Sequence, residues 1–253
     1  MRIALITGAS SGIGKEFAKK IPKLYKELDE IWIVARRTEL LKELTKYSEV
    51  PMKIFDGDLT RDYIYERIER ELDRSRSDIR MLVNCAGFGK TGAFRESDEK
   101  GQLGMIDLNC KALTKMIHIC MPYLTGGSRI INLSSAAAFC PQPGFAVYAA
   151  TKSYVKSLSY ALGAELRERG IYVTCVCPGS VDTEFFHVSG ELPGREGMIK
   201  KASAEKVVHK ALVDAAKKKR ISVYGIPMNF TRMMTRVSPT SVSTEFMKWF
   251  NAI

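Results

Sequence analysis

Short apolar runs alternate along the chain with longer amphipathic segments. The apolar runs have the length of strands and are apolar at nearly every position, as is typical of strands covered on both faces. They predict strands at residues 2–7, 31–35, 52–55, 80–84, 129–135, 172–177 and 221–225. The longer segments predict helices near residues 12–28, 38–47, 61–74, 98–123, 147–169 and 204–219.

Strand–helix alternation of this kind favours an α/β fold with a doubly wound parallel sheet of Rossmann type, with about seven strands flanked by helices. Right-handed crossovers bring the carboxyl ends of such strands to one edge, where ligands bind. The chain contains no linker, repeat or low-complexity segment. We therefore expect residues 1–253 to form one domain.

The composition is typical of a globular protein and indicates neither a membrane protein nor a metal-binding one. The chain has 253 residues, of which 45% are hydrophobic and 26% charged, as in ordinary globular proteins. It has no apolar run that could span a bilayer, and the first residues lack the pattern of a signal peptide, so we expect a cytoplasmic protein. The six cysteines form no CxxC pair and only three histidines are present, which predicts no metal site.

The chain is basic, with a net charge of +11. Such a charge attracts anions, which include nucleic acids, anionic membranes and phosphorylated ligands. No nucleic-acid-binding motif accompanies it, so we expect no nucleic-acid partner. A solvated helix face is the simplest interpretation of the basic residues around 200–220.

A glycine-rich loop, TGASSGIG at residues 7–14, lies between the first predicted strand and the first predicted helix. Glycine permits a tight turn and lets the backbone approach a pyrophosphate, which sits at the helix N-terminus. The position of the loop favours a dinucleotide site over a plain turn between a strand and a helix. The expected contacts are Gly8, Ser10, Ser11, Gly12, Ile13 and Gly14.

Two arginines, Arg36 and Arg37, follow the second predicted strand, and the first carboxylate after them is Glu39. NAD-binding proteins commonly place an acidic residue here to hold the ribose 2′-hydroxyl. An arginine instead holds a 2′-phosphate through charge-assisted hydrogen bonds. The sequence therefore favours NADP(H) as cofactor, with NAD(H) as the alternative.

The stretch YAATK places Tyr148 four residues before Lys152. On a helix, these side chains lie on the same face, one turn apart. A nearby positive charge favours the phenolate, so we expect a lowered pKa for Tyr148, which would make it a proton donor or acceptor near neutral pH. Taken alone, this spacing also occurs by chance on helix surfaces.

Together and in this order, the motifs resemble those of the short-chain dehydrogenase/reductase family, in its compact single-domain branch. The match covers nearly the whole chain, although Cys85 stands where the family usually has a second asparagine. Besides the glycine loop and the YxxxK pair, the matching residues are Asp58-Leu59, Asn84-Cys85-Ala86-Gly87, Asn109, Ser135 and, in PGSVDT, Pro178, Gly179, Val181 and Thr183.

The resemblance implies an oxidoreductase that interconverts a ketone or aldehyde and an alcohol by hydride transfer. Tyr148 would exchange the proton, and Lys152 would lower the tyrosine pKa and bind the nicotinamide ribose. Ser135 would hydrogen-bond the substrate oxygen, and Asn109 would hold a water that links Lys152 to solvent. The implied cofactor contacts add Asp58, Leu59, Asn84, Ala86, Gly87, Pro178, Gly179, Val181 and Thr183 to the loop residues and to Tyr148 and Lys152.

Substrate choice in the family lies in variable loops, here residues 184–201, whose glycines and prolines predict a mobile lid. Apolar residues near the motifs weakly favour a hydrophobic substrate such as a steroid, an acyl chain or an aromatic carbonyl. These residues are Phe88, Ala137, Phe139, Pro141, Phe145, Phe185 and Phe186. The C-terminal stretch is rich in methionine and aromatic residues, which favours core and subunit packing over a pocket wall or peripheral membrane contact.

The family often forms dimers or tetramers, so we expect a homodimer or homotetramer. Two other functions compete with the reductase. The first is a nucleotide-sugar epimerase-type relative, which shares YxxxK but usually has a different glycine loop and a longer C-terminal domain. The second is an NADP(H)-binding regulatory or scaffold protein without turnover, which has no chemical need for Ser135, Tyr148 and Lys152 together.

Overall fold

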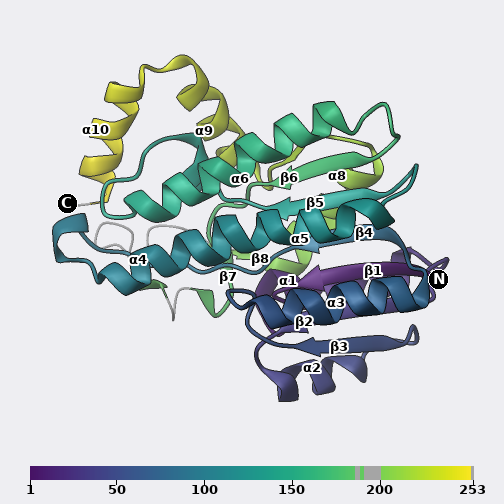
Figure 1. The fold of residues 1–253 in the computed structure, drawn as a ribbon. Coiled ribbons are helices and arrows are strands. Elements are labelled where there is room, and N and C mark those ends of the chain that lie inside the picture. Colours follow the sequence, from purple (N-terminus) through teal and green to yellow (C-terminus); the bar gives the residue numbers. More distant parts are fainter. Residues whose placement is uncertain (186–188, 191–200, 252–253) are drawn as a thin grey trace.

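In the part of the chain that the structure describes, residues 1–185, 189–190 and 201–251, a seven-stranded parallel sheet forms the centre of the molecule (Figure 1). The computed structural model orders its strands β3-β2-β1-β4-β5-β6-β9. Their bounds are β1 (Arg2–Thr7), β2 (Glu30–Ala35), β3 (Met52–Asp56), β4 (Asp78–Asn84), β5 (Arg129–Leu133), β6 (Tyr172–Val176) and β9 (Ile221–Ser222). The predicted Rossmann-type sheet is therefore confirmed.

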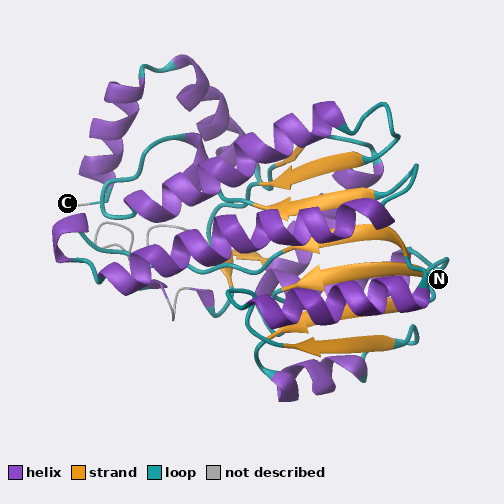
Figure 2. Cartoon of the chain, viewed as in Figure 1, coloured by secondary structure: helices purple, strands orange, loops and turns teal. Residues whose placement is uncertain are grey.

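Helices cover both faces of the sheet (Figure 2). One face packs against α3 (Asp62–Ser75), α5 (Leu113–Cys120) and α6 (Ala146–Glu165). The other packs against α1 (Gly12–Leu24), α2 (Thr38–Thr45) and α8 (Ala204–Ala216). Apolar residues at helical spacing drive this packing, as in α3, where Ile64, Ile68 and Leu72 are fully buried.

The chain reverses its winding direction between β1 and β4, which are neighbours at the middle of the sheet. Their carboxyl ends are level, because Thr7 pairs with Asn84. In open α/β sheets, the crevice beyond such a switch point is where ligands bind. This register places the loop at residues 7–14 beside the loop that follows β4.

The helix predicted at 98–123 is interrupted. It consists of α4 (Glu99–Ile106), a π-helical turn (Asp107–Ala112) and α5. The turn contains Asn109, whose side chain bonds to the loop after β4 and to α6. Hydrophobic periodicity does not reveal a turn of this kind, because the register changes by one residue and the apolar face continues. Such π-turns are frequent at functional sites.

The C-terminal end also differs from prediction. The last strand has two residues instead of five, because the chain turns away at Gly225, whose φ is +90°, and Pro227 lies in the first turn of α9. Two unpredicted helices follow, α9 (Ile226–Val237) and α10 (Thr240–Phe250). They form the yellow hairpin of Figure 1, which projects beyond the end of the sheet.

The hairpin carries an outward apolar stripe, which we call the C-terminal apolar face. Its side chains are more than half exposed, so they are not part of the core of this chain. They are Ile226, Phe230, Met233 and Val237 on α9, and Val242, Phe246 and Trp249 on α10. Among the described residues, no helix is both long and apolar enough to cross a bilayer.

Candidate active site

The glycine loop is shaped by close backbone contacts. Gly8 has a φ of +68°, and a Cβ there would lie 2.7 Å from the amide nitrogen of Ala86. A Cβ at Gly14 would lie 2.2 Å from the carbonyl oxygen of Gly8. Real Cβ atoms do not approach other atoms so closely, so any larger residue would push the loop away from the end of β4 or from the first turn of α1.

Thr7 joins this loop to the next one in space. Its hydroxyl accepts hydrogen bonds from the amides of Cys85 at 3.1 Å and Ala86 at 3.2 Å. The side chain is 2% exposed. The sequence prediction missed this residue, although it is the first letter of TGASSGIG. Thr7 thus sets the position of residues 84–87 relative to the loop at 7–14.

The loop at 7–14 has the features of a pyrophosphate cradle. Ser11, the N-cap of α1, makes no side-chain capping bond, so the first-turn amides of α1 have no capping partner from it. The position that a Cβ on Gly12 would occupy lies 3.2 Å from the Cβ of Thr183, on the opposite wall. Backbone amides and the positive end of the helix dipole attract phosphate. These residues therefore fit a dinucleotide.

The two arginines after β2 differ in their partners. Arg37 donates from Nη1 to Glu184 Oε2 at 2.8 Å, and from Nη2 and Nε to Ser10 Oγ at 3.2 and 3.3 Å. Arg36 is exposed and makes no side-chain hydrogen bond or ion pair with any described residue. Arg37 therefore binds the glycine loop through Ser10, while the guanidinium of Arg36 is accessible to an anion.

The predicted adenine contacts lie after β3. Asp58 Oδ1 accepts bonds from the amide and the hydroxyl of Thr60, both at 2.9 Å. This local turn fixes Asp58 without using its other oxygen in a bond that the structure shows. Leu59 is 6% exposed and packs into the core beneath the loop.

At the end of β4, Asn84 donates from Nδ2 to Asn132 Oδ1 at 2.9 Å. Within the described residues, its own Oδ1 is the buried side-chain oxygen that lacks a hydrogen-bond partner. A buried acceptor without a partner costs roughly 1–3 kcal/mol. The structure thus leaves one unused acceptor at the switch point of the sheet.

The loop after β6 forms the facing wall. The carbonyl oxygen of Pro178 accepts a bond from the amide of Ala136 at 2.8 Å, which joins this loop to the end of β5. Val181 lies in β7 (Val181–Asp182), which pairs with β8 (Ala202–Ser203). Gly179 is packed so closely that a Cβ would lie 2.7 Å from the sulfur of Met228 in α9.

Helix α6 carries Tyr148 and Lys152 on its buried side. The Lys152 Nζ lies 5.6 Å from the centre of the Tyr148 ring and donates to the carbonyl oxygen of Leu133 at 3.0 Å. Ser135 lies close enough to Tyr148 for its side chain to lower the pKa of the phenol. The structure therefore brings Ser135, Tyr148 and Lys152 together.

The expected lowering of the Tyr148 pKa is wrong for the protein's own groups. Burial raises the pKa of Tyr148 to about 12, and the Ser135 side chain offsets this only in part. The side chain is 7% exposed, so the phenolate would lose its hydration. Burial also lowers the pKa of Lys152 to about 8, because its ammonium is removed from water too. Sequence spacing reports the neighbouring charge but not this desolvation.

Ser135 serves two partners. It is the N-cap of a short 3₁₀ turn (Ala136–Phe139), where its Oγ accepts a bond from the amide of Ala137 at 3.1 Å. The same oxygen is the group that meets the Tyr148 hydroxyl. The capping bond therefore holds Ser135 in the orientation that faces Tyr148.

Asn109 is 1% exposed and bonded within the protein. Its Oδ1 accepts from the amide of Phe88 at 3.1 Å, and its Nδ2 donates to the Phe88 carbonyl at 2.9 Å and to Thr151 Oγ1 at 3.1 Å. Both side-chain N–H groups are thus engaged. This geometry favours a positioning role between the loop after β4 and α6, and the water-holding role stays a prediction. Gly87 lies against it, since a Cβ there would be 2.8 Å from Asn109 Oδ1.

Aromatic rings surround Tyr148. Phe145 stacks on it with ring centres 4.2 Å apart, and Phe185 approaches at 5.5 Å. Phe88 and Ala137, two further predicted substrate residues, belong to the same apolar cluster. Phe139 does not, since it packs with Cys175, Cys177 and Met228. Phe186 and most of the predicted lid at 184–201 lie outside the described residues.

The second question about this edge of the sheet is whether it could bind a metal ion. Within the described ranges, the structure has no group of three or more His, Cys, Asp or Glu side chains that could hold a metal ion. What the site offers is one phenol, one ammonium, a serine hydroxyl and an apolar wall, beside a phosphate cradle. This set suits proton exchange with an oxygen next to a bound dinucleotide.

Comparison with known proteins agrees with this arrangement. The sequence profile of the family described as "short chain dehydrogenase" matches residues 2–192. Sulfoacetaldehyde reductase 2 of Chromohalobacter salexigens is 33% identical over 192 residues, which cover 72% of this chain and 74% of that protein.

Two solved structures share the fold over nearly the whole chain. A short-chain dehydrogenase from Sphingobium yanoikuyae in complex with NADPH has a TM-score of 0.78 and 28% identity, and the match covers 93% of each chain. The bulky-bulky ketone specific alcohol dehydrogenase from Comamonas testosteroni has a TM-score of 0.75 and 26% identity, over 93% of this chain and 92% of that one.

Proposed function

Since the chain belongs to the short-chain dehydrogenase/reductase family of oxidoreductases that act on alcohol and carbonyl groups, we propose that it catalyses NADP(H)-dependent reduction of a ketone or aldehyde, and the reverse oxidation. The observation that carries this proposal is the convergence of Ser135, Tyr148 and Lys152 at the mouth of the dinucleotide cradle. A protein that only binds a nucleotide has no need for this set.

In reduction, a dihydronicotinamide held by the cradle would supply a hydride to the carbonyl carbon. Tyr148 donates its phenolic proton to the oxygen, which becomes the hydroxyl of the product. Ser135 hydrogen-bonds the same oxygen as negative charge develops on it. Lys152 stabilises the phenolate that remains on Tyr148, and a proton from solvent restores it. A positioned acid of this kind contributes roughly 10²–10⁴-fold to the rate.

The raised pKa of Tyr148 supports the direction of reduction. With a pKa of about 12, the phenol is protonated at neutral pH and therefore starts as an acid. The Lys152 ammonium, with a pKa of about 8, is still charged at pH 7. In oxidation, Tyr148 must first lose its proton. The oxidised nicotinamide would carry a positive charge that lowers the Tyr148 pKa, so oxidation relies on this charge more than reduction does.

We assign the 2′-phosphate of NADP(H) chiefly to Arg36. Its exposed guanidinium follows β2 directly and has no partner among the described residues. Arg37 already pairs with Glu184 and Ser10, so it contributes more by holding the loop than by binding phosphate. The NADPH complex of the Sphingobium relative supports NADP(H) as the cofactor.

We infer a hydrophobic ketone or alcohol as substrate. Phe88, Phe145 and Phe185 are the aromatic members of the apolar cluster around Tyr148, and Met105 is fully buried among them. Bulky ketones are the substrates named for the Comamonas relative, which supports this inference.

We also infer a homo-oligomer in a reducing compartment such as the cytoplasm. The C-terminal apolar face is larger than the scattered apolar residues of typical monomers, which supports burial against another copy. All six cysteines are thiols and not disulfides, which fits a reducing compartment.

The test is NADPH oxidation with a panel of steroid, aliphatic and aromatic ketones. We expect turnover in the native protein and a loss of roughly 10²-fold or more in Tyr148→Phe. Tyr154→Phe is the matched control, because Tyr154 is an exposed residue of the same helix whose hydroxyl bonds Thr114. It should keep full activity.

Three other results would contradict the proposal. NADPH binding without turnover of any ketone, or of the alcohols with NADP⁺, would favour the regulatory role. Conversion of a nucleotide sugar without net loss of NADPH would favour the epimerase. Absence of cofactor binding would remove the basis for all three functions.

A further inference from the structure

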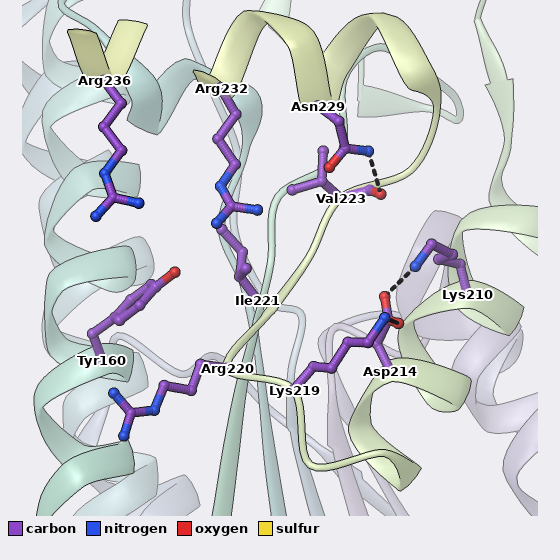
Figure 3. A pocket seen from close by; sticks show the side chains of 10 residues that line it. All are labelled: Tyr160, Lys210, Asp214, Lys219, Arg220, Ile221, Val223, Asn229, Arg232 and Arg236. Atoms are coloured by element: carbon purple, nitrogen blue, oxygen red, sulfur yellow. Dashed lines mark hydrogen bonds and ion pairs between the residues drawn. The ribbon is translucent and has the colours of Figure 1, made fainter. Parts of the chain in front are cut away.

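A second polar site lies away from the candidate active site. A cavity of about 480 Å³ opens between α6, α8, β9 and α9, at the edge of the sheet (Figure 3). Among the described residues that line it, five are cationic and one is acidic. The cations are Lys210, Lys219, Arg220, Arg232 and Arg236, and the acid is Asp214. We call this cavity the basic pocket.

Asp214, the acidic residue of the pocket lining, is bound by two of the pocket lysines. It is 2% exposed and accepts bonds from Lys210 and, at 2.8 Å, from the hydroxyl of Ser222. Its other oxygen lies 2.9 Å from Lys219 Nζ. Although burial opposes it, these bonds hold the pKa of Asp214 below its usual value, so the carboxylate is charged and fully engaged. Both lysines therefore share one carboxylate, which leaves one of their two positive charges uncompensated.

The three arginines have no such compensation. Arg220, Arg232 and Arg236 form no side-chain hydrogen bond or ion pair with any residue that the structure describes. In Figure 3, Arg232 and Arg236 extend from α9 into the pocket, and Arg220 lies below them. Tyr160 on α6 turns its hydroxyl into the space between Arg236 and Arg220. Three guanidinium groups and a phenol thus surround one cavity.

The orientation of α9 is an independent observation. A surface helix normally turns its apolar stripe to the core and its charged side to water. Here Phe230, Met233 and Val237 are exposed, while Arg232 is half-buried and lines the pocket together with the exposed Arg236. Cations that face one another across a cavity repel, and a bound anion relieves this repulsion.

We propose that the basic pocket binds the phosphate group of a small polyanionic ligand, separately from the dinucleotide cradle. Arginine presents a planar fork of N–H donors that matches phosphate in bidentate geometry. Tyr160 adds a neutral hydroxyl to the lining, while Asn229 Nδ2 donates to the carbonyl oxygens of Val223 and Gly225. The ligand class is a phosphate monoester or pyrophosphate, whose two or more negative charges match the three uncompensated guanidinium groups.

The probe is inorganic pyrophosphate, titrated into the full chain by isothermal calorimetry at ionic strength held constant with chloride. Three paired variants locate it. Arg232→Gln with Arg236→Gln removes two pocket charges. Lys46→Gln with Arg70→Gln removes two exposed charges outside the pocket, one at the end of α2 and one on α3. Arg36→Gln with Arg37→Gln removes the charges next to the dinucleotide cradle. Thermal unfolding in chloride checks that each variant folds.

We expect a pyrophosphate site that the Arg232/Arg236 pair weakens at least about tenfold, because charge-assisted hydrogen bonds to the anion are lost. Both other pairs should retain the site. Three results would overturn the proposal. The first is that pyrophosphate does not bind the native chain. The second is equal weakening in the Lys46/Arg70 pair, which would indicate unspecific attraction by charge. The third is weakening only in the Arg36/Arg37 pair, which would place the anion in the cradle.

A second arm separates two sources of the phosphate group. The outward apolar stripe of α9 lies beside the pocket, so the phosphate of a lipid headgroup is one source and a free metabolite is the other. Sedimentation with vesicles of phosphatidylcholine containing phosphatidic acid detects the first. Binding to vesicles that the Arg232/Arg236 pair abolishes would identify a lipid, while pyrophosphate binding without vesicle binding would identify a soluble ligand.

Discussion

Replacing Thr7 by valine tests whether one buried hydroxyl organises the dinucleotide cradle. Valine has nearly the same shape, so the substitution leaves no cavity, but it removes the acceptor for the amides of Cys85 and Ala86. A buried amide that loses its partner costs roughly 1–3 kcal/mol. Two amides therefore predict a loss of about 2–6 kcal/mol in the free energy of unfolding, against a total of about 5–15 kcal/mol for typical domains.

The assay is urea denaturation of Thr7→Val beside Thr7→Ser, which keeps the hydroxyl and loses a methyl group. We expect the valine variant to be clearly the less stable of the two. We also expect its affinity for NADPH to fall, because the loops at 7–14 and 84–87 lose their connection. A valine variant as stable as the serine variant, with unchanged NADPH affinity, would refute the idea that this hydroxyl holds the cradle together.

Three further predictions concern the site. The pKa of Lys152, about 8, lies below its unfolded value of 10.5, so its ammonium is lost as pH rises through 8. We therefore expect kcat/KM for reduction to decline above pH 8 and stability to urea to rise between pH 8 and 10.5. A flat activity profile would contradict this. Arg36→Gln should weaken NADPH roughly 10–100-fold and NADH little, with a smaller effect for Arg37→Gln, and equal loss of both cofactors would remove the 2′-phosphate assignment. Phe145→Leu should lower the Tyr148 pKa toward 10, because water would again reach the phenol. The pKa is measured by NMR titration of the Tyr148 resonance, which is identified by its absence from the spectrum of Tyr148→Phe. An unchanged pKa would show that other groups bury the phenol.

Much of the fold followed from the sequence because each central strand is apolar throughout and each helix has one apolar face. The prediction failed where tertiary contacts decide. The π-turn at Asp107–Ala112 depends on bonds from Asn109 to Phe88 and Thr151, which no local pattern reveals. The short β9 and the following hairpin depend on Gly225 and Pro227, whereas the sequence pattern places Gly225 in the last strand and predicts no helix after it.

For the site, the sequence predicted which residues come together, but it did not predict their burial or their pKa values. Motif spacing put Tyr148 and Lys152 on one helical face, and the structure has them there. It could not show that Phe145 and Phe185 cover the phenol, since these rings come from separate segments. Burial therefore reversed the expected direction of the Tyr148 pKa shift. The partners of Arg37 were equally hidden, because Glu184 lies far away in the sequence.

The pairing of β1 with β4 also has a consequence for how the chain folds. β1 is synthesised first, yet its partner on one side is complete only after residue 84, with two strands and three helices in between. Closing a contact of such long range is slow compared with forming the local β1–β2 unit. Because the amides of residues 85 and 86 fix the glycine loop through Thr7, a nascent chain that ends before them lacks a finished dinucleotide loop. Nucleotide binding during refolding would therefore report the central strand pairing, and should lag behind the appearance of helix.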